Sequence, residues 1–232
     1  MRWLTPRGLV AACVVGSAVA WGLSWPGLVV LAAFFISGSL LTQLAERGGG
    51  RGEGPRRNAR QVLANGGVAA VAALLGSWPG AAGAIAAAAA DTWATEVGAF
   101  SPIPPRLVTS WRRVTRGTSG GMTVLGTLGG CAGAVTIAWL TFALAPRSVA
   151  PRFSTVAIAG VVGMLADSLL GATLQGKYEC PACDARFERG NTVCHVPVRL
   201  TSGWRWLDND AVNFAATVVG AFGAAIGSHM SR

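Results

Sequence analysis

Charged residues are scarce in this chain of 232 residues, and their scarcity excludes an ordinary soluble domain. Asp, Glu, Lys and Arg make up 12% of the sequence, whereas a soluble domain carries about 25%. Hydrophobic residues make up 52%, and Ala and Gly dominate, as is typical of helices that pack closely in lipid. The composition predicts an integral membrane protein, and the length fits one domain over residues 1–232.

The sequence also lacks a zinc finger, an RNA-binding signature and a basic helix. Without these, the net charge of +9 and the pI near 10.9 do not indicate a nucleic-acid partner. The basic residues lie in short loops between apolar segments, where they set topology and contact anionic lipid. We therefore expect membrane lipids as partners and no nucleic acid.

Seven apolar stretches approach the length of about 20 residues that a spanning helix needs. They are residues 8–23, 27–45, 61–78, 80–99, 122–145, 153–175 and 207–228. Tight turns are expected at residues 24–26 and 78–79, and longer basic loops lie between other stretches. The sequence thus predicts an all-α, polytopic transmembrane helical bundle.

The positive charges predict how this bundle is oriented. If the N-terminus is cytoplasmic, sixteen of the nineteen Lys and Arg residues fall on the cytoplasmic side, as the positive-inside rule requires. One alternative remains open: Arg2, Arg7, the apolar run and Ala18-Val19-Ala20 resemble a signal peptide. Its cleavage would leave six spans, with every later loop on the same side.

Four acidic residues lie inside or at the ends of the predicted spans: Asp91, Glu96, Asp167 and Asp210. A carboxylate at helix-centre depth costs about 2.5–3.5 kcal/mol on insertion scales, so such groups usually face a cavity or a partner. The topology brings all four to the cytoplasmic side, with Asn213 one turn after Asp210. Oxygen ligands that meet at one depth suit Mg²⁺. Alternatively, these acids pair with loop arginines or only cap helices.

A Gly-rich segment, residues 116–123, ends the second cytoplasmic loop and opens the fifth span. Small residues at a helix N-terminus let backbone N–H groups approach an anion. Thr118 and Ser119 are the expected N-caps of that helix. The predicted phosphate-binding residues are Arg113, Arg116, Thr118, Ser119, Gly120 and Gly121. The segment is not a Walker loop, because it lacks the Gly-Lys-Ser/Thr ending, and it could be an ordinary Gly-rich turn.

A Cys-rich cytoplasmic loop over residues 176–206 carries Cys180-Pro-Ala-Cys183 and Cys194-His195. Disulfides are rare in a reducing compartment, and a Cys-x2-Cys knuckle with a distal Cys and His is compatible with tetrahedral zinc. A zinc ion here would be structural. A structural or redox thiol pair is the alternative.

Four ordered motifs, residues 90–98, 117–121, 167–175 and 209–213, carry a resemblance that covers the chain from about Gln61 onward. In these motifs the chain resembles the integral membrane family called domain of unknown function 92. That family includes animal transmembrane protein 19 and a plant plastid phytyl-phosphate kinase.

The resemblance implies a membrane-embedded kinase that converts an isoprenoid monophosphate to its diphosphate with Mg²⁺ and a nucleoside triphosphate, CTP or ATP. It suits Asp91, Asp167 and Asp210 as metal ligands, supported by Glu96 and Asn213, in a site on the cytoplasmic face of the cell membrane. A transporter or carrier of a lipid phosphate or ion is the alternative, because intramembrane acids also mark ion pathways.

Overall fold

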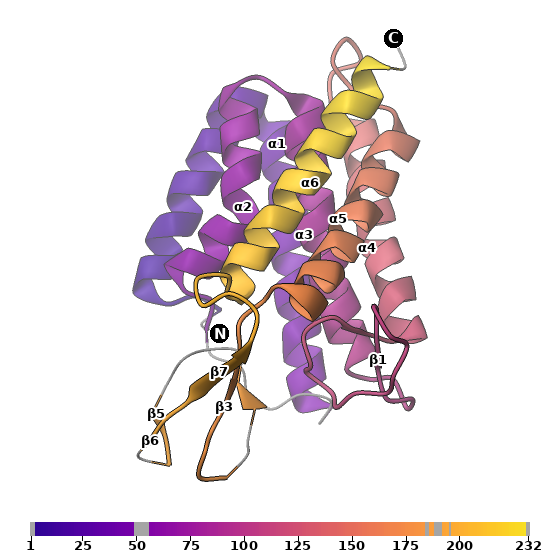
Figure 1. Cartoon of the computed structure of the whole chain (residues 1–232). Helices are drawn as coiled ribbons and strands as arrows, with labels where there is room; N and C mark the ends of the chain where they lie inside the picture. Colours follow the sequence, from indigo (N-terminus) through magenta and orange to yellow (C-terminus); the bar gives the residue numbers. More distant parts are fainter. Residues whose placement is uncertain (1–2, 49–55, 184–185, 188–191, 195, 231–232) are drawn as a thin grey trace.

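The computed structural model describes residues 3–48, 56–183, 186–187, 192–194 and 196–230. Six α-helices stand side by side in one bundle (Figure 1). They are α1 (Pro6–Arg47), α2 (Ala59–Leu74), α3 (Trp78–Gly98), α4 (Val124–Leu144), α5 (Phe153–Thr173) and α6 (Asn209–His229). Each of the seven predicted stretches is mostly helical, with bounds that shift by a few residues.

The 42-residue helix α1 folds back on itself at Ser24, which has φ 60° and ψ −164°. In a straight helix, residues 3 and 35 would lie about 48 Å apart. Instead, the rings of Trp3 and Phe35 pack with their centroids 5.8 Å apart. Pro26 just after the break has no backbone N–H to complete a helical ladder. The two stretches predicted on either side of residues 24–26 are therefore the two arms of α1.

The turn predicted at residues 78–79 is wrong by a few residues. Trp78 and Pro79 are the first residues of α3, and the chain turns at residues 75–77, where Gly76 has φ 69°. Ser77 caps α3 by accepting a hydrogen bond from the Gly80 N–H at 3.2 Å. Pro is well suited to a first turn, because the N–H that it lacks has no helical partner there.

Helix α3 is the central helix, and it contacts all five other helices. Its residues 81–90 are all buried, and they are Ala, Gly and Ile. Such small side chains allow close helix packing in lipid. At the α3–α6 crossing, a Cβ atom on Gly83 would collide with the Gly220 carbonyl, so both positions require glycine.

Four of the six helices, α1, α4, α5 and α6, are long and apolar enough to cross a membrane. Among the described residues, α2 and α3 do not meet that standard. Helix α2 has only 16 residues, and α3 is rich in weakly apolar Ala and Gly and carries two acids. The predicted helical membrane bundle is confirmed, while the seven-span count is confirmed only in part.

Short strands modify the all-α prediction. Strands β1 (Arg106–Leu107) and β2 (Gly121–Met122) pair antiparallel. The Cys-rich loop holds β3 (Lys177–Glu179), β4 (Arg186–Phe187), β5 (Thr192–Val193), β6 (Val196–Pro197) and β7 (Arg199–Ser202), arranged as a β4-β3-β7 sheet and a β5-β6 pair. Figure 1 shows both strand-bearing loops and the N-terminus at one end of the bundle and the C-terminus at the other.

Candidate active site

A cavity of about 400 Å³ lies at the loop-bearing end of the bundle. Its walls come from the C-terminal ends of α1, α3 and α5, the N-terminal ends of α2, α4 and α6, and the segment that precedes α4. Nine of the predicted site residues line it: Asp91, Glu96, Arg116, Thr118, Ser119, Gly120, Gly121, Asp167 and Asn213. These nine residues are therefore brought together in one cavity, and their functional roles stay predictions.

Helix α3 contributes two carboxylates to this cavity. Asp91 is partly buried, and Glu96 is buried with 5% of its surface exposed. The Thr42 hydroxyl of α1 donates a hydrogen bond of 2.9 Å to Glu96 Oε1. This contact joins α1 to α3 and holds the Glu96 carboxylate in place.

Arg57 lines the cavity but was not among the predicted site residues. Its guanidinium carbon lies 5.7 Å from the centroid of the Phe35 ring. Burial lowers the pKa of Arg57, and the Glu96 carboxylate opposes that shift. The Asn58–Gln61 capping box that starts α2 was the available signal, because it places Arg57 at a helix end rather than far out in a loop.

Asp167 of α5 and Asn213 of α6 are linked across the cavity wall. With the Asn213 amide oriented toward the carboxylate, its nitrogen donates to Asp167 Oδ2 at 2.9 Å and to the Asn209 carbonyl at 3.1 Å. Both linked side chains line the cavity, as does Asn209. The predicted convergence of these two motifs is therefore seen in the structure.

Asp210 occupies a different position from Asp91 and Asp167. It is buried but does not line the cavity. Its Oδ2 lies 3.8 Å from Arg60 Nε, and Arg60 also contacts Asp208 at 2.9 Å. Asp208 caps α6 by accepting from the Ala211 N–H at 3.1 Å. These contacts match the alternative in which acids pair with loop arginines and cap helices, and the metal role of Asp210 stays a prediction.

The cavity carboxylates do not form a closed metal shell by themselves. Among the described residues, one group of three or more His, Cys, Asp or Glu has its ligand atoms within 4.8 Å of one another, and it consists of cysteines. Asp91 and Asp167 nevertheless face one space. That arrangement suits Mg²⁺ held by one or two carboxylates and completed by substrate phosphates and water.

The Gly-rich segment forms a tight turn before α4. Thr118 accepts a backbone hydrogen bond from the Gly121 N–H at 2.9 Å, and Gly117 and Gly120 have φ of 83° and 77°. The predicted N-caps Thr118 and Ser119 are wrong: Thr123 caps α4 by accepting from the Gly126 N–H at 2.9 Å. Helix α4 begins later because the intervening residues pair in β2.

Gly120 presses this turn against α5. A Cβ atom there would lie 2.6 Å from the Ser168 carbonyl oxygen and 2.6 Å from the Ala172 nitrogen. The left-handed φ and the close approach both favour glycine. The turn therefore packs beside Ser168, the residue that follows Asp167.

The two arginines predicted to bind phosphate, Arg113 and Arg116, occupy different positions. Arg116 lines the cavity, and its guanidinium donates to the carbonyl oxygens of Ser101 and of Ala99, the latter at 3.3 Å, just past the end of α3. Arg113 is exposed and does not line the cavity. Arg116 is therefore placed both to stabilise the α3 terminus and to face an anion, while the role of Arg113 stays a prediction.

Gln175 is a second cavity residue that was not among the predicted site residues. It is 2% exposed and lines the cavity just beyond α5. Its Nε2 donates no hydrogen bond to any of the described residues. A buried amide donor without a partner is costly, so a ligand that brings an acceptor into the cavity would relieve that cost.

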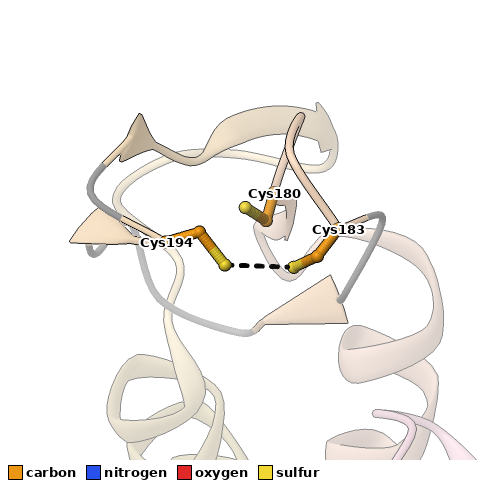
Figure 2. A group of neighbouring side chains, drawn as sticks. All are labelled: Cys180, Cys183 and Cys194. Carbon is orange, nitrogen blue, oxygen red and sulfur yellow. Dashed lines mark hydrogen bonds between the residues drawn. The ribbon is translucent and has the colours of Figure 1, made fainter.

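The Cys-rich loop brings three thiols together away from this cavity. Figure 2 shows Cys180, Cys183 and Cys194 pointing toward one another, with the Cys183 and Cys194 sulfurs 3.6 Å apart. A hydrogen bond and charge from Cys183 raise the pKa of Cys194 to about 11, while the Ala182 N–H lowers the pKa of Cys180. The fourth predicted ligand, His195, lies outside the described residues.

Comparison with known proteins connects this architecture to a family. Protein PGR of Arabidopsis thaliana is 33% identical over 239 residues, covering 86% of this chain and 80% of that protein. An uncharacterized membrane protein of Methanocaldococcus jannaschii is 32% identical over 184 residues, covering 76% of each chain. Protein VTE6, chloroplastic, of Arabidopsis thaliana is 24% identical over 227 residues, covering 90% of this chain and 61% of that protein.

No solved structure matches the chain. Residues 1–221, which include every wall of the cavity, match the family model described as integral membrane protein DUF92. The chain therefore belongs to the DUF92 family of integral membrane proteins.

Proposed function

We propose that this protein is a membrane-embedded kinase that transfers a phosphoryl group from a nucleoside triphosphate to an isoprenoid monophosphate. The observation that carries the proposal is one cavity that combines Asp91 and Asp167 with two arginines and a Gly-rich turn. The resemblance described above supplies the acceptor class.

The cavity supplies groups that position and neutralise phosphates rather than groups that attack. Among the described residues that line it, none is His, Cys or Lys. Phosphoryl transfer depends on positioning, Mg²⁺ and charge neutralisation more than on a strong nucleophile. An acceptor that is already a phosphate needs no dedicated base. The lining therefore supports direct transfer between two bound phosphates.

The cavity offers both carboxylates and cations to its ligands. Asp91 and Asp167 would hold Mg²⁺, which neutralises the charge on the triphosphate. Arg57 and Arg116, the Gly117–Gly121 backbone and the N-terminus of α4 would contact phosphate oxygens. The Gln175 amide would donate to one more oxygen. Two polyanions can thus lie side by side without strong repulsion.

The size of the cavity limits which part of the substrate it encloses. Its volume of about 400 Å³ is at the small end of ligand pockets, which span about 300–1,000 Å³. The cavity has room for phosphate groups, but not for a long prenyl chain in addition. We infer that the apolar tail leaves between helices toward lipid, where its transfer from water is favourable.

The positive charges predict how the bundle is oriented in the membrane. With seven passes, counting the two arms of α1 together with α2 and α3, the loop-bearing end carries thirteen of the fifteen Lys and Arg residues that the structure describes. By the positive-inside rule, we expect that end and the cavity to face the cytoplasmic side of a cell membrane. Nucleoside triphosphates are available there.

The test is direct product formation. Purified protein would be incubated with phytyl or geranylgeranyl monophosphate, Mg²⁺ and CTP, ATP, GTP or UTP, and diphosphate product measured by mass spectrometry. We expect Mg²⁺-dependent product with at least one donor. If no combination gives diphosphate while the same protein moves a lipid phosphate or ion across vesicles, the carrier hypothesis replaces the kinase.

A further inference from the structure

We propose that Cys180, Cys183 and Cys194 bind a structural zinc ion that holds the Cys-rich loop together. This proposal is independent of the kinase activity, because none of the three residues lines the cavity. It rests on the positions of the sulfurs, on the strands that carry them and on the small core of the loop.

The sulfur positions match a tetrahedral thiolate site. Zinc binds Cys sulfur at about 2.3 Å, so two sulfurs on one tetrahedral ion lie about 3.8 Å apart. The Cys183 and Cys194 sulfurs are 3.6 Å apart, and the three sulfurs all lie within 4.8 Å of one another. The observed separation is much longer than the bond of about 2.05 Å in a disulfide.

Two separate hairpins deliver these ligands. Cys180 and Cys183 follow β3, which pairs antiparallel with β4. Cys194 follows β5, which pairs antiparallel with β6. Cys194 adopts a left-handed conformation with φ 51°, and Figure 2 shows its sulfur turned toward Cys183. One ion bound by all three would join two hairpins that share no strand.

The loop has little else to hold it. Of its residues whose burial is described between 177 and 206, Tyr178 and Cys180 are buried, and all four residues of β7 are exposed. Small units that bury so little apolar surface usually need a metal, a disulfide or a partner to stabilise them. These three thiols supply three of the four ligands of a structural zinc site, in which the metal contributes folding free energy.

A zinc ion in the Cys-rich loop would also restrict the motion of the cavity rim. The loop starts directly after Gln175 and returns beside it, where the Trp204 N–H donates to the Leu174 carbonyl at 2.9 Å and the Gly176 N–H to the Leu207 carbonyl at 3.0 Å. Zinc on the distal hairpins is therefore a positioning device for the loop and takes no part in phosphoryl transfer.

Zinc content of the full chain in detergent tests the proposal. We expect about one zinc ion per chain by elemental analysis, and its loss from the Cys180→Ser/Cys183→Ser variant. The matched control is Cys13→Ser/Cys131→Ser, which removes two cysteines of α1 and α4 outside the cluster and should keep its zinc. Replacement by Co²⁺ should give the intense sulfur-to-metal absorption of a thiolate site.

A second measurement does not require the variant to fold. Wild-type protein stripped with a chelator should be cut within residues 176–206 by a protease at least tenfold faster, and added Zn²⁺ should restore resistance. The proposal is overturned if wild-type and variant proteins contain equal zinc. It is also overturned if Cys183 and Cys194 are recovered as a disulfide, or if stripping and reloading leave the cleavage rate unchanged.

Discussion

The two halves of α3 lie in one helix yet have opposite surroundings. Residues 81–90 are buried on every side among other helices, and they contain no polar side chain. The next two turns carry Asp91, Thr92, Thr95 and Glu96, which all line the cavity. A carboxylate is costly at membrane depth, and here it occurs where α3 leaves the packed part of the bundle.

This contrast separates two requirements within one fold. In the packed half, small residues let α3 approach its neighbours closely, so the sequence there serves helix association. In the cavity half, polar residues from all six helices and a Gly-rich turn face one space, so the sequence there serves a ligand. Substitutions in the two halves should consequently fail in different ways.

The largest expected effect is on the cavity carboxylates. Asp91→Asn or Asp167→Asn should lower phosphoryl transfer about 10²-fold or more, on the order of 3 kcal/mol, because an amide is a poor Mg²⁺ ligand. Expression and thermal stability should hold, since a charge at membrane depth is removed. The measurement is the rate of diphosphate formation alongside a melting curve in detergent.

Glu179→Gln is the matched control for these changes. It makes the same replacement of a carboxylate by an amide in β3, outside the cavity, and should leave the rate unaltered. Equal losses in all three variants would show that the cavity acids have no special role.

The packed half should respond through folding. A Cβ atom at Gly220 would lie 2.7 Å from the Ala87 Cβ, so Gly220→Ala should cost about 1–3 kcal/mol of stability through overpacking. At Gly223 the nearest atom is the Ala159 Cβ at 3.5 Å, an ordinary contact, so Gly223→Ala should be neutral or stabilising. Thermal unfolding compares the two, and the fraction of Gly220→Ala that remains folded should keep its turnover rate.

A smaller effect is expected at Gln175. Gln175→Leu removes the buried Nε2 donor, so the empty protein should melt at the same temperature or higher. The apparent KM should rise about tenfold, or about 1.4 kcal/mol. Gln43→Leu, on α1 and outside the cavity, is the matched control. A lower melting temperature with an unaltered KM would assign Gln175 to packing alone.

The smallest effect on activity is expected from probes of orientation. Ser110 and Ser148 are both exposed and lie in loops before β2 and between α4 and α5, at opposite ends of the bundle. Ser110→Cys should react with an impermeant thiol reagent from the cytoplasmic side and Ser148→Cys from the outer side, with the labelled peptides identified by mass spectrometry. Reaction of both from one side would contradict the assigned topology.

Several parts of the site could be predicted from the sequence because each is local. Asp91, Glu96 and Asp167 stand in apolar runs, where a charge is costly to insert into a membrane, and the sequence alone shows this. Successive spans run in opposite directions, which brings the motifs to one end. The cap at Thr123 was missed because β1 and β2, which are distant in the chain, pair and delay the start of α4. Such pairing depends on tertiary contacts that local propensity does not record.

Local sequence and tertiary packing determined different features of this protein. By itself the sequence determined the membrane class, the helical stretches, the basic end and the polar motifs, because hydrophobicity, charge and turn chemistry act on neighbouring residues. Only the tertiary structure decided that Arg57 and Gln175 face the cavity and that Asp210 pairs with Arg60 instead. Which side chains meet depends on how helices rotate and cross, and those angles are set by packing at positions such as Gly83 and Gly220.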